Sequence, residues 1–210
     1  MVLARELSLA DISAYTASAP IESEVFIHGA LCVCHSGQCL FSSLVGGRSG
    51  NRGECAQPCR LPYNGSKYPL SLKDNCLAGH IPELIDAGVS SLKIEGRMKG
   101  PEYVGAVTAV YRRLLDERRA ATAEETDYLA GIFSRSGFTD AYFCGRTGHD
   151  MLGTRTEADK KRTAAAGNGP RKTARRGGIF PQKAAGQARA SPHGIYAQSG
   201  SAHRRRAEIL

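Results

Sequence analysis

Strand-like and helix-like segments alternate along residues 1–159, and this order constrains the fold more than any other feature of the chain. Apolar and β-branched runs predict strands at residues 2–7, 23–29, 68–74 and 90–96. Helical periodicity and proline positions predict helices at residues 10–19, 80–88, 101–120 and 123–135. This alternation is typical of parallel βα units, in a barrel or in an open doubly wound sheet. Four strands cannot close an eight-stranded barrel, so we expect an α/β fold that is half of a TIM-like barrel.

The third of these predicted helices, residues 101–120, shows the clearest amphipathic pattern. Its apolar side chains at helical spacing are Tyr103, Val107, Val110 and Leu114, which would share one face. We expect that face to pack against the sheet.

The positive charge of the chain is concentrated at its C-terminal end. Residues 1–159 carry a net charge of −3, whereas residues 160–210 carry +11. The latter segment has almost no large apolar residues and cannot bury a core, so we predict a disordered basic tail. Such a tail either binds the phosphates of RNA or membranes nonspecifically or is a solvated extension. The abrupt change of composition at the start of this tail would also fit a reading-frame shift in the gene.

Six of the seven cysteines lie between residues 32 and 76. The N-terminus carries Arg5 and Glu6 where a secretory signal needs an apolar core, and no apolar run is long enough to span a membrane. We therefore expect a soluble, cytoplasmic protein. In a reducing cytosol, clustered thiols bind metal or perform redox chemistry more often than they form disulfides.

The predicted strands bring the polar residues and the cysteines to one rim. His28 ends the second strand, Lys73 and Asp74 end the third, and Glu95 and Arg97 end the fourth. The cysteines fill the loops that follow the second and third strands, where α/β folds place their chemistry. Glycines beside the cysteines let backbone N–H groups approach the sulfur atoms. The spacing contains no C-x₂-C pair, which leaves an iron–sulfur cluster, a zinc ion or no metal as alternatives.

Each remaining rim residue has both a functional and a structural interpretation. His28 is either a general acid or base or a hydrogen-bonded structural group. Glu95 and Arg97 either pair with each other or hold an anionic substrate. The basic residues of the loops suit phosphate or carboxylate recognition, but a solvated surface explains them nearly as well; they are Arg48, Arg52, Arg60, Lys67 and Lys73. No Ser-His-Asp or Cys-His pairing follows from spacing.

Several blocks of the sequence closely resemble peptidase family U32, the collagenase-like protease family. They are "EVFIHGALCVCHSGQCLFSSLVGGRSGNRGECAQPCRLPY", "YPLSLKDNC", "PELIDAGVSSLKIEGRMKGPEYV" and "VYRRLLD", in the family's order. The resemblance covers residues 1–157 as a partial barrel domain and leaves residues 158–210 as the basic tail. It implies the C-terminal half of a TIM-like barrel, since members begin with a longer N-terminal portion.

The family name implies proteolysis, whereas better-understood members imply oxygen-independent hydroxylation of tRNA, ribosomal RNA or a ubiquinone precursor. The resemblance implies a [4Fe-4S] cluster on four cysteines, with Cys32, Cys39, Cys55 and Cys76 as ligands. Cys59 belongs to the family pattern and is the strongest rival ligand, while Cys34 is a departure from it.

We therefore predict iron–sulfur-dependent hydroxylation of RNA, with RNA and a small-molecule hydroxyl donor as partners. His28, Glu95 and Arg97 are the candidate catalytic residues, and Arg52 and Lys73 are the candidate substrate-binding residues. The alternatives are a collagenase-like peptidase and a non-catalytic fragment, with zinc as the alternative metal.

Overall fold

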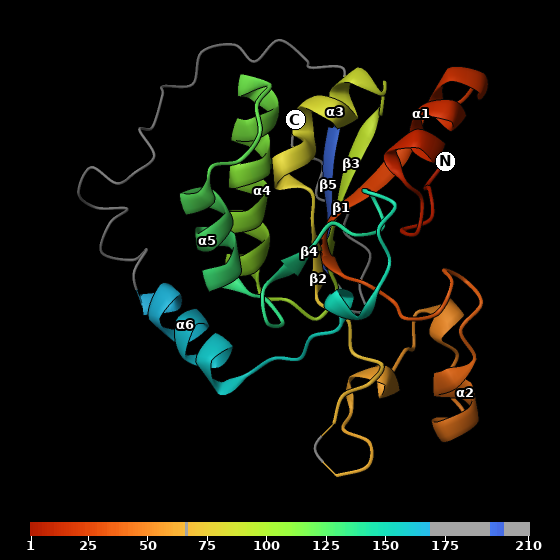
Figure 1. Cartoon of the computed structure of the whole chain (residues 1–210), viewed down its shortest axis with the longest axis vertical. Helices are drawn as coiled ribbons and strands as arrows, with labels where there is room; N and C mark the ends of the chain where they lie inside the picture. The colour runs from red at the N-terminus through yellow and green to blue at the C-terminus, as the bar shows by residue number, and fades with distance from the viewer. Residues whose placement is uncertain (66, 169–193, 200–210) are drawn as a thin grey trace.

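The chain folds as a mixed α/β structure in which helices flank a sheet (Figure 1). The computed structural model describes residues 1–65, 67–168 and 194–199. The strand order of the sheet is β4-β2-β1-β3-β5. These strands are β1 (Glu24–Ala30), β2 (Asp74–Cys76), β3 (Ser91–Gly96), β4 (Phe138–Thr139) and β5 (Gly194–Ser199).

The α-helices connect and cover these strands. They are α1 (Leu9–Ser18), α2 (Phe41–Gly46), α3 (Ile81–Asp86), α4 (Pro101–Glu117), α5 (Ala123–Ile132) and α6 (Glu157–Asn168). Short 3₁₀ helices lie in the loops: η1 (Gly50–Arg52), η2 (Pro58–Arg60), η3 (Ala78–His80) and η4 (His149–Met151). Helices α4 and α5 lie side by side on one side of the sheet, and α1 lies on the other (Figure 1). The predicted helices at residues 10–19, 80–88, 101–120 and 123–135 are thereby confirmed.

The core lies between the sheet and the α4–α5 layer. The predicted apolar face of α4 is confirmed, because its four side chains Tyr103, Val107, Val110 and Leu114 are all buried. They pack in one cluster with the strand residues Ile27 and Ile94, which are fully buried. Burial of each such side chain contributes about 1.5–3 kcal/mol. This packing fixes the central strands β1 and β3, from which the cysteine loops and the rim residues extend.

Strand β2 departs from the expected parallel arrangement. β1 and β3 are parallel, but β2 runs antiparallel to β1, with His28 opposite Cys76 and Ala30 opposite Asp74. The reason is that the chain between β1 and β2 is a loop excursion with the short helices α2, η1 and η2, rather than a helical crossover on the sheet face. Asp74 therefore begins β2 at the end of the sheet where β1 finishes, so the expected shared rim still forms.

Two of the predicted strands are wrong in extent. The segment at residues 2–7 makes only an isolated bridge from Val2 to Glu24, because the chain turns at Arg5. The segment at residues 68–74 enters a strand only at Asp74, while Leu72 makes an isolated bridge to Leu152. Instead of long strands, the two segments supply Arg5 and Asp74, which form ion pairs with Glu95 and Arg135.

The predicted disorder of residues 158–210 is wrong for two parts of the tail. Helix α6 extends through Asn168 and lies beside α5, and β5 pairs in parallel with β3 from Ser91↔Gly194 to Gly96↔Ser199. The rest of the predicted tail, residues 169–193 and 200–210, lies outside the described residues. Among the described helices, none has the length and apolarity needed to cross a bilayer.

Candidate functional site

The loops between β1 and β2 gather four cysteines near the end of the sheet. These loops carry α2, η1 and η2 and project beyond the ends of β1 and β2 (Figure 1). The thiol of Cys59 interacts electrostatically with those of Cys32, Cys39 and Cys55, and Cys32 likewise interacts with Cys39 and Cys55. We call Cys32, Cys39, Cys55 and Cys59 the loop thiols.

Hydrogen-bond donors surround two of the loop thiols. The backbone N–H of Gln57 donates to Cys55 Sγ at 3.3 Å, and the hydroxyl of Ser42 donates to the same sulfur at 3.7 Å. An Arg5 guanidinium nitrogen lies 3.5 Å from Cys32 Sγ. Donors of this kind stabilise negative charge on thiolate sulfur and are typical of the surroundings of sulfur-bound metal centres.

The protonation state of the loop thiols follows from their burial. Burial raises the pKa of Cys32, and the nearby Arg5 opposes that rise. Burial also raises the pKa of Cys59, with Arg60 opposing it. These thiols are therefore protonated at neutral pH, and a metal that binds them must displace protons.

Cys76, the fourth ligand implied by the family resemblance, lies apart from the loop thiols. It is on β2 opposite His28, and its sulfur contacts the Tyr111 hydroxyl at 3.5 Å. Burial raises its pKa, and the hydrogen bond with Tyr111 opposes that rise. Asp74, at the start of β2, lies opposite Ala30 at the end of β1, so Cys76 lies two residues further along β2 from the rim. The structure thus brings Cys32, Cys39 and Cys55 together with Cys59, the rival ligand, whereas Cys76 lies within β2.

Arg5 connects the end of β3 to the cysteine loops. Its guanidinium donates to Glu95 Oε2 at 2.8 Å, reaches Cys32, and lies 4.0 Å above the centre of the Phe26 ring. Of the two interpretations of Glu95 and Arg97, the structure does not show the mutual ion pair: Glu95 pairs with Arg5 and accepts a hydrogen bond from the backbone N–H of Arg97 at 2.9 Å. The role of Arg5 was missed because its segment was predicted to be a strand.

The side chain of Arg97 points to the cysteine loops. Its guanidinium donates to the carbonyl oxygen of Gly53, two residues before Cys55. Arg97 therefore contacts the loop that carries the loop thiols.

Gly29 explains the "HG" pair at the end of β1. Its φ is +104°, and a Cβ there would lie 2.5 Å from the Glu95 carbonyl oxygen and 2.9 Å from Glu95 Cβ. Only glycine allows β1 to pass the end of β3 this closely. The close approach holds Glu95 where it can pair with Arg5.

His28 is buried in the core rather than open to the rim. Its Nδ1 lies 3.1 Å from the Tyr111 hydroxyl, and its ring contacts those of Tyr103 and Phe138. Burial lowers its pKa to about 3, with the positive charge of Lys99 adding to the effect. His28 is therefore neutral at physiological pH, and its geometry favours the structural interpretation over general acid–base catalysis.

Arg60 is a structural residue of the loops. Its guanidinium donates to the carbonyl oxygens of Leu31 and Leu72 and to the Ser71 hydroxyl, at 2.6 Å for Leu31 and 3.0 Å for Ser71. It thereby ties the outgoing and returning ends of the cysteine excursion. By contrast, Arg52 is exposed on η1.

Lys73 is half-buried at the start of β2. Its backbone N–H donates to the Met151 carbonyl at 2.8 Å. Gly153 lies against its side chain, since a Cβ on Gly153 would meet Lys73 Cγ at 2.5 Å. The two predicted substrate-binding residues therefore occupy different parts of the rim region.

A buried cationic group surrounds Asp74 at the start of β2. Asp74 Oδ1 pairs with Arg135, and its other oxygen, Oδ2, has no hydrogen-bond partner. Lys99 lies over the Phe133 ring, and burial, reinforced by Arg135, lowers its pKa to about 7. The net positive charge of this group suits the binding of an anion.

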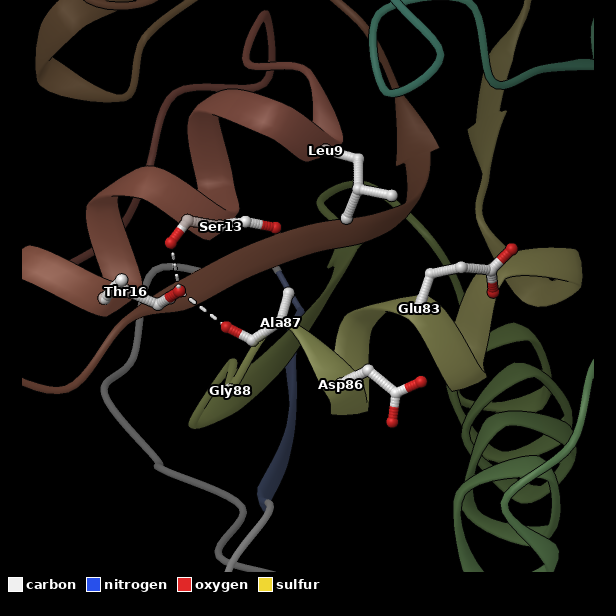
Figure 2. A pocket seen from close by; sticks show the side chains of 8 residues that line it. Leu9, Ser13, Thr16, Glu83, Asp86, Ala87 and Gly88 are labelled. Atoms are coloured by element: carbon white, nitrogen blue, oxygen red, sulfur yellow. Dashed lines mark hydrogen bonds between the residues drawn. The ribbon is translucent and has the colours of Figure 1, made fainter.

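A separate groove of about 590 Å³ lies between α1 and α3. Figure 2 shows Ser13 and Thr16 of α1 on one wall and Asp86 on the other. Thr16 donates to the Ala87 carbonyl at 2.5 Å across the groove. None of the loop thiols lines this groove, so it is distinct from the cysteine site.

The fold and the site together define a class of protein: an α/β protein with a cluster of thiols in the loops at one end of its sheet. Comparison with known proteins makes this specific: the profile of peptidase family U32 matches residues 1–153, so the chain belongs to that family.

Relatives in this family carry two kinds of name. The 23S rRNA 5-hydroxycytidine C2501 synthase of Escherichia coli is 46% identical over 157 residues, which cover 70% of this chain and 23% of that protein. The tRNA hydroxylation protein P1 of Bacillus subtilis is 40% identical over 132 residues, covering 55% of this chain and 31% of that protein. A collagenase of Porphyromonas gingivalis is 38% identical over 143 residues, which cover 60% of this chain and 39% of that protein. The chain thus spans less than half the length of these relatives, and no solved structure matches it.

Proposed function

We propose that this protein takes part in the hydroxylation of an RNA base, through a [4Fe-4S] cluster held by the loop thiols. The observation that carries the proposal is the gathering of Cys32, Cys39, Cys55 and Cys59 in one set of loops at the end of the sheet. The names of the ribosomal RNA and tRNA hydroxylation relatives support RNA as the substrate class.

The residues present fit a cluster. Four thiols from separate loop positions supply the ligand set, and the donors from Gln57, Ser42 and Arg5 suit thiolate charge. We choose Cys59 over Cys76 as the fourth ligand because Cys59 lies in the same loops as the other three thiols, whereas Cys76 lies on β2. A bound cluster would supply electron transfer or a Lewis-acidic iron for an oxygen-independent reaction. Zinc on the same thiols is the alternative occupant.

The surrounding charges support an anionic substrate. Arg52 and Arg97 are on or against the cysteine loops, where they would contact the RNA backbone. Lys99 and Arg135 surround the buried Asp74, and we assign this group to a small anionic hydroxyl donor. In this scheme Arg5 and Glu95 position Cys32, while His28 keeps the end of β1 in place.

Two observations support a larger barrel. β1 and β3 are parallel neighbours in the sheet, and the relatives are more than twice as long as the region they share with this chain. We propose that the described sheet is the C-terminal part of a TIM-like barrel in a cytoplasmic protein.

A chimera tests the function. Residues 1–157 replace the corresponding segment of the E. coli C2501 synthase, and the chimera is expressed in a strain without the native enzyme. Mass spectrometry of the ribosomal RNA fragment should show hydroxylation at C2501. Cys55→Ser should abolish it, and Cys34→Ser, which alters a thiol outside the proposed ligand set, should leave it intact. A folded, cluster-loaded chimera without hydroxylation would contradict the proposal.

The collagenase names raise a peptidase as the second candidate. A cysteine peptidase needs a thiol whose pKa is lowered by a neighbouring base. Here Cys144 lies 4.0 Å from His80 Nε2, but burial and the Asp140 hydrogen bond raise its pKa. Labelling by a thiol-directed protease inhibitor, together with cleavage of a gelatin-like peptide, would favour the peptidase.

A further inference from the structure

Three metal-ligating side chains meet beyond the far ends of β2 and β4. They are His80, which follows β2, and Asp140 and Cys144, which follow β4. Both strands begin at the rim and run away from the cysteine loops, since Asp74 pairs with Ala30 and also with Phe138. The three ligand atoms lie within 4.8 Å of one another, and none of them belongs to the site already described.

The distances among the three atoms are close to those around a single ion. His80 Nε2 lies 2.9 Å from Asp140 Oδ2, Cys144 Sγ lies 3.3 Å from the same oxygen, and the sulfur lies 4.0 Å from Nε2. Tetrahedral zinc with ordinary bond lengths needs ligand atoms separated by about 3.4–3.6 Å. Shifts of about half an ångström would therefore accommodate the ion.

The local structure holds the ligands in place before any ion binds. The backbone N–H of Cys144 donates to the Asp140 carbonyl at 3.0 Å, so one turn presents both side chains. The ring of buried Phe143 packs on the His80 imidazole with 4.8 Å between ring centres. Glu83 Oε1 lies 3.3 Å from His80 Nδ1, which leaves Nε2 directed at Asp140. A carboxylate behind a histidine in this way is a common support for metal-binding imidazoles.

We propose that His80 Nε2, Asp140 Oδ2 and Cys144 Sγ form a zinc site that ties the ends of β2 and β4 together. The mixed nitrogen, oxygen and sulfur donor set suits Zn²⁺. A water molecule takes the fourth position. On binding, the thiol proton is released to solvent, and the imidazole carries its proton on Nδ1, where it donates to Glu83.

Arg146 places a positive charge beside this site. Its guanidinium contacts the other Asp140 oxygen, Oδ1, at 3.4 Å, and its side chain is 72% exposed. The guanidinium also hydrogen-bonds the Cys144 thiol and contacts Oδ1 rather than Oδ2, so Oδ2 is left to the ion. The arginine must move away from the sulfur when the ion binds, which its exposed position permits.

Cobalt binding to the full 210-residue chain under anaerobic conditions tests this site apart from the loop thiols. Co²⁺ in a thiolate-containing tetrahedral site gives visible d–d bands and a sulfur-to-metal charge-transfer band. We expect Cys144→Ser to remove one equivalent of bound Co²⁺ with its bands, and Cys55→Ser, which disrupts only the loop thiols, to retain that equivalent. Zn²⁺ should displace the Co²⁺ and raise the melting temperature of Cys55→Ser but not of the Cys55→Ser/Cys144→Ser double variant.

Equal Co²⁺ binding by the wild-type chain and Cys144→Ser would overturn the proposal. The exposed position of Cys144 makes a folding defect in that variant unexpected, and circular dichroism checks it. His80→Gln keeps the test decisive if Cys144→Ser does not fold, because it too must lose the equivalent. If binding survives in His80→Gln, the three side chains do not form a site.

Discussion

Replacing Gly29 by alanine should destabilise the chain through two separable effects. A left-handed φ of +104° costs an alanine about 1–2 kcal/mol. The new Cβ would also lie 2.5 Å from the Glu95 carbonyl oxygen and 2.9 Å from Glu95 Cβ, and relieving such overlap costs about 1–3 kcal/mol more. We therefore expect the free energy of unfolding to fall by about 2–5 kcal/mol, measured by urea denaturation under reducing conditions.

Gly37→Ala is the matched control for this experiment. Gly37 also has a positive φ, +79°, but a Cβ there would have no atom within 4 Å. It should lose only the conformational part, about 1–2 kcal/mol. Equal losses at Gly29 and Gly37 would refute the claim that β1 passes β3 too closely for a side chain. Equal losses would also mean that the close approach to Glu95 does not explain why a glycine follows His28.

Two pH-dependent predictions follow from the buried titratable groups. Burial lowers the pKa of His28 to about 3, so the unfolded chain binds the proton more tightly and stability is lost as pH falls below about 6.5. Wild-type protein should lose about 2 kcal/mol more than His28→Gln between pH 6.5 and 5, measured by urea midpoints, and parallel pH profiles would contradict the burial of His28. Burial lowers the pKa of Lys99 to about 7, so stability should rise between about pH 7 and 10. Lys99→Met should lack up to about 3 kcal/mol of that rise by pH 9.5, and a rise of equal size in both proteins would mean that Lys99 is solvated.

The helices and the central strands could be predicted because their signals are local. The apolar spacing of α4 and the proline at its start mark one buried face, and β1 and β3 are short apolar runs between helices. The direction of β2 could not be predicted, because it depends on whether the excursion at residues 31–73 crosses the sheet face or projects beyond its end.

The site was predictable in its composition but not in its pairings. Clustering of the cysteines in the sequence indicated a thiol centre, but the choice between Cys59 and Cys76 depends on how the loops fold back. Arg5 pairs with a carboxylate ninety residues away, and the His80 and Cys144 side chains meet from distant segments. Contacts of this kind leave no periodic signal in the sequence.

The most direct test of the central claim is the iron and acid-labile sulfide content of two serine variants after anaerobic reconstitution. If the loop thiols hold a [4Fe-4S] cluster, Cys59→Ser should lose most of the iron, sulfide and brown colour. Cys76→Ser should keep the wild-type content, because Cys76 lies beside Tyr111 and away from the loop thiols. Loss of the cluster in Cys76→Ser with its retention in Cys59→Ser would contradict the proposed ligand set. Zinc without sulfide in the reconstituted wild-type chain would contradict the cluster itself.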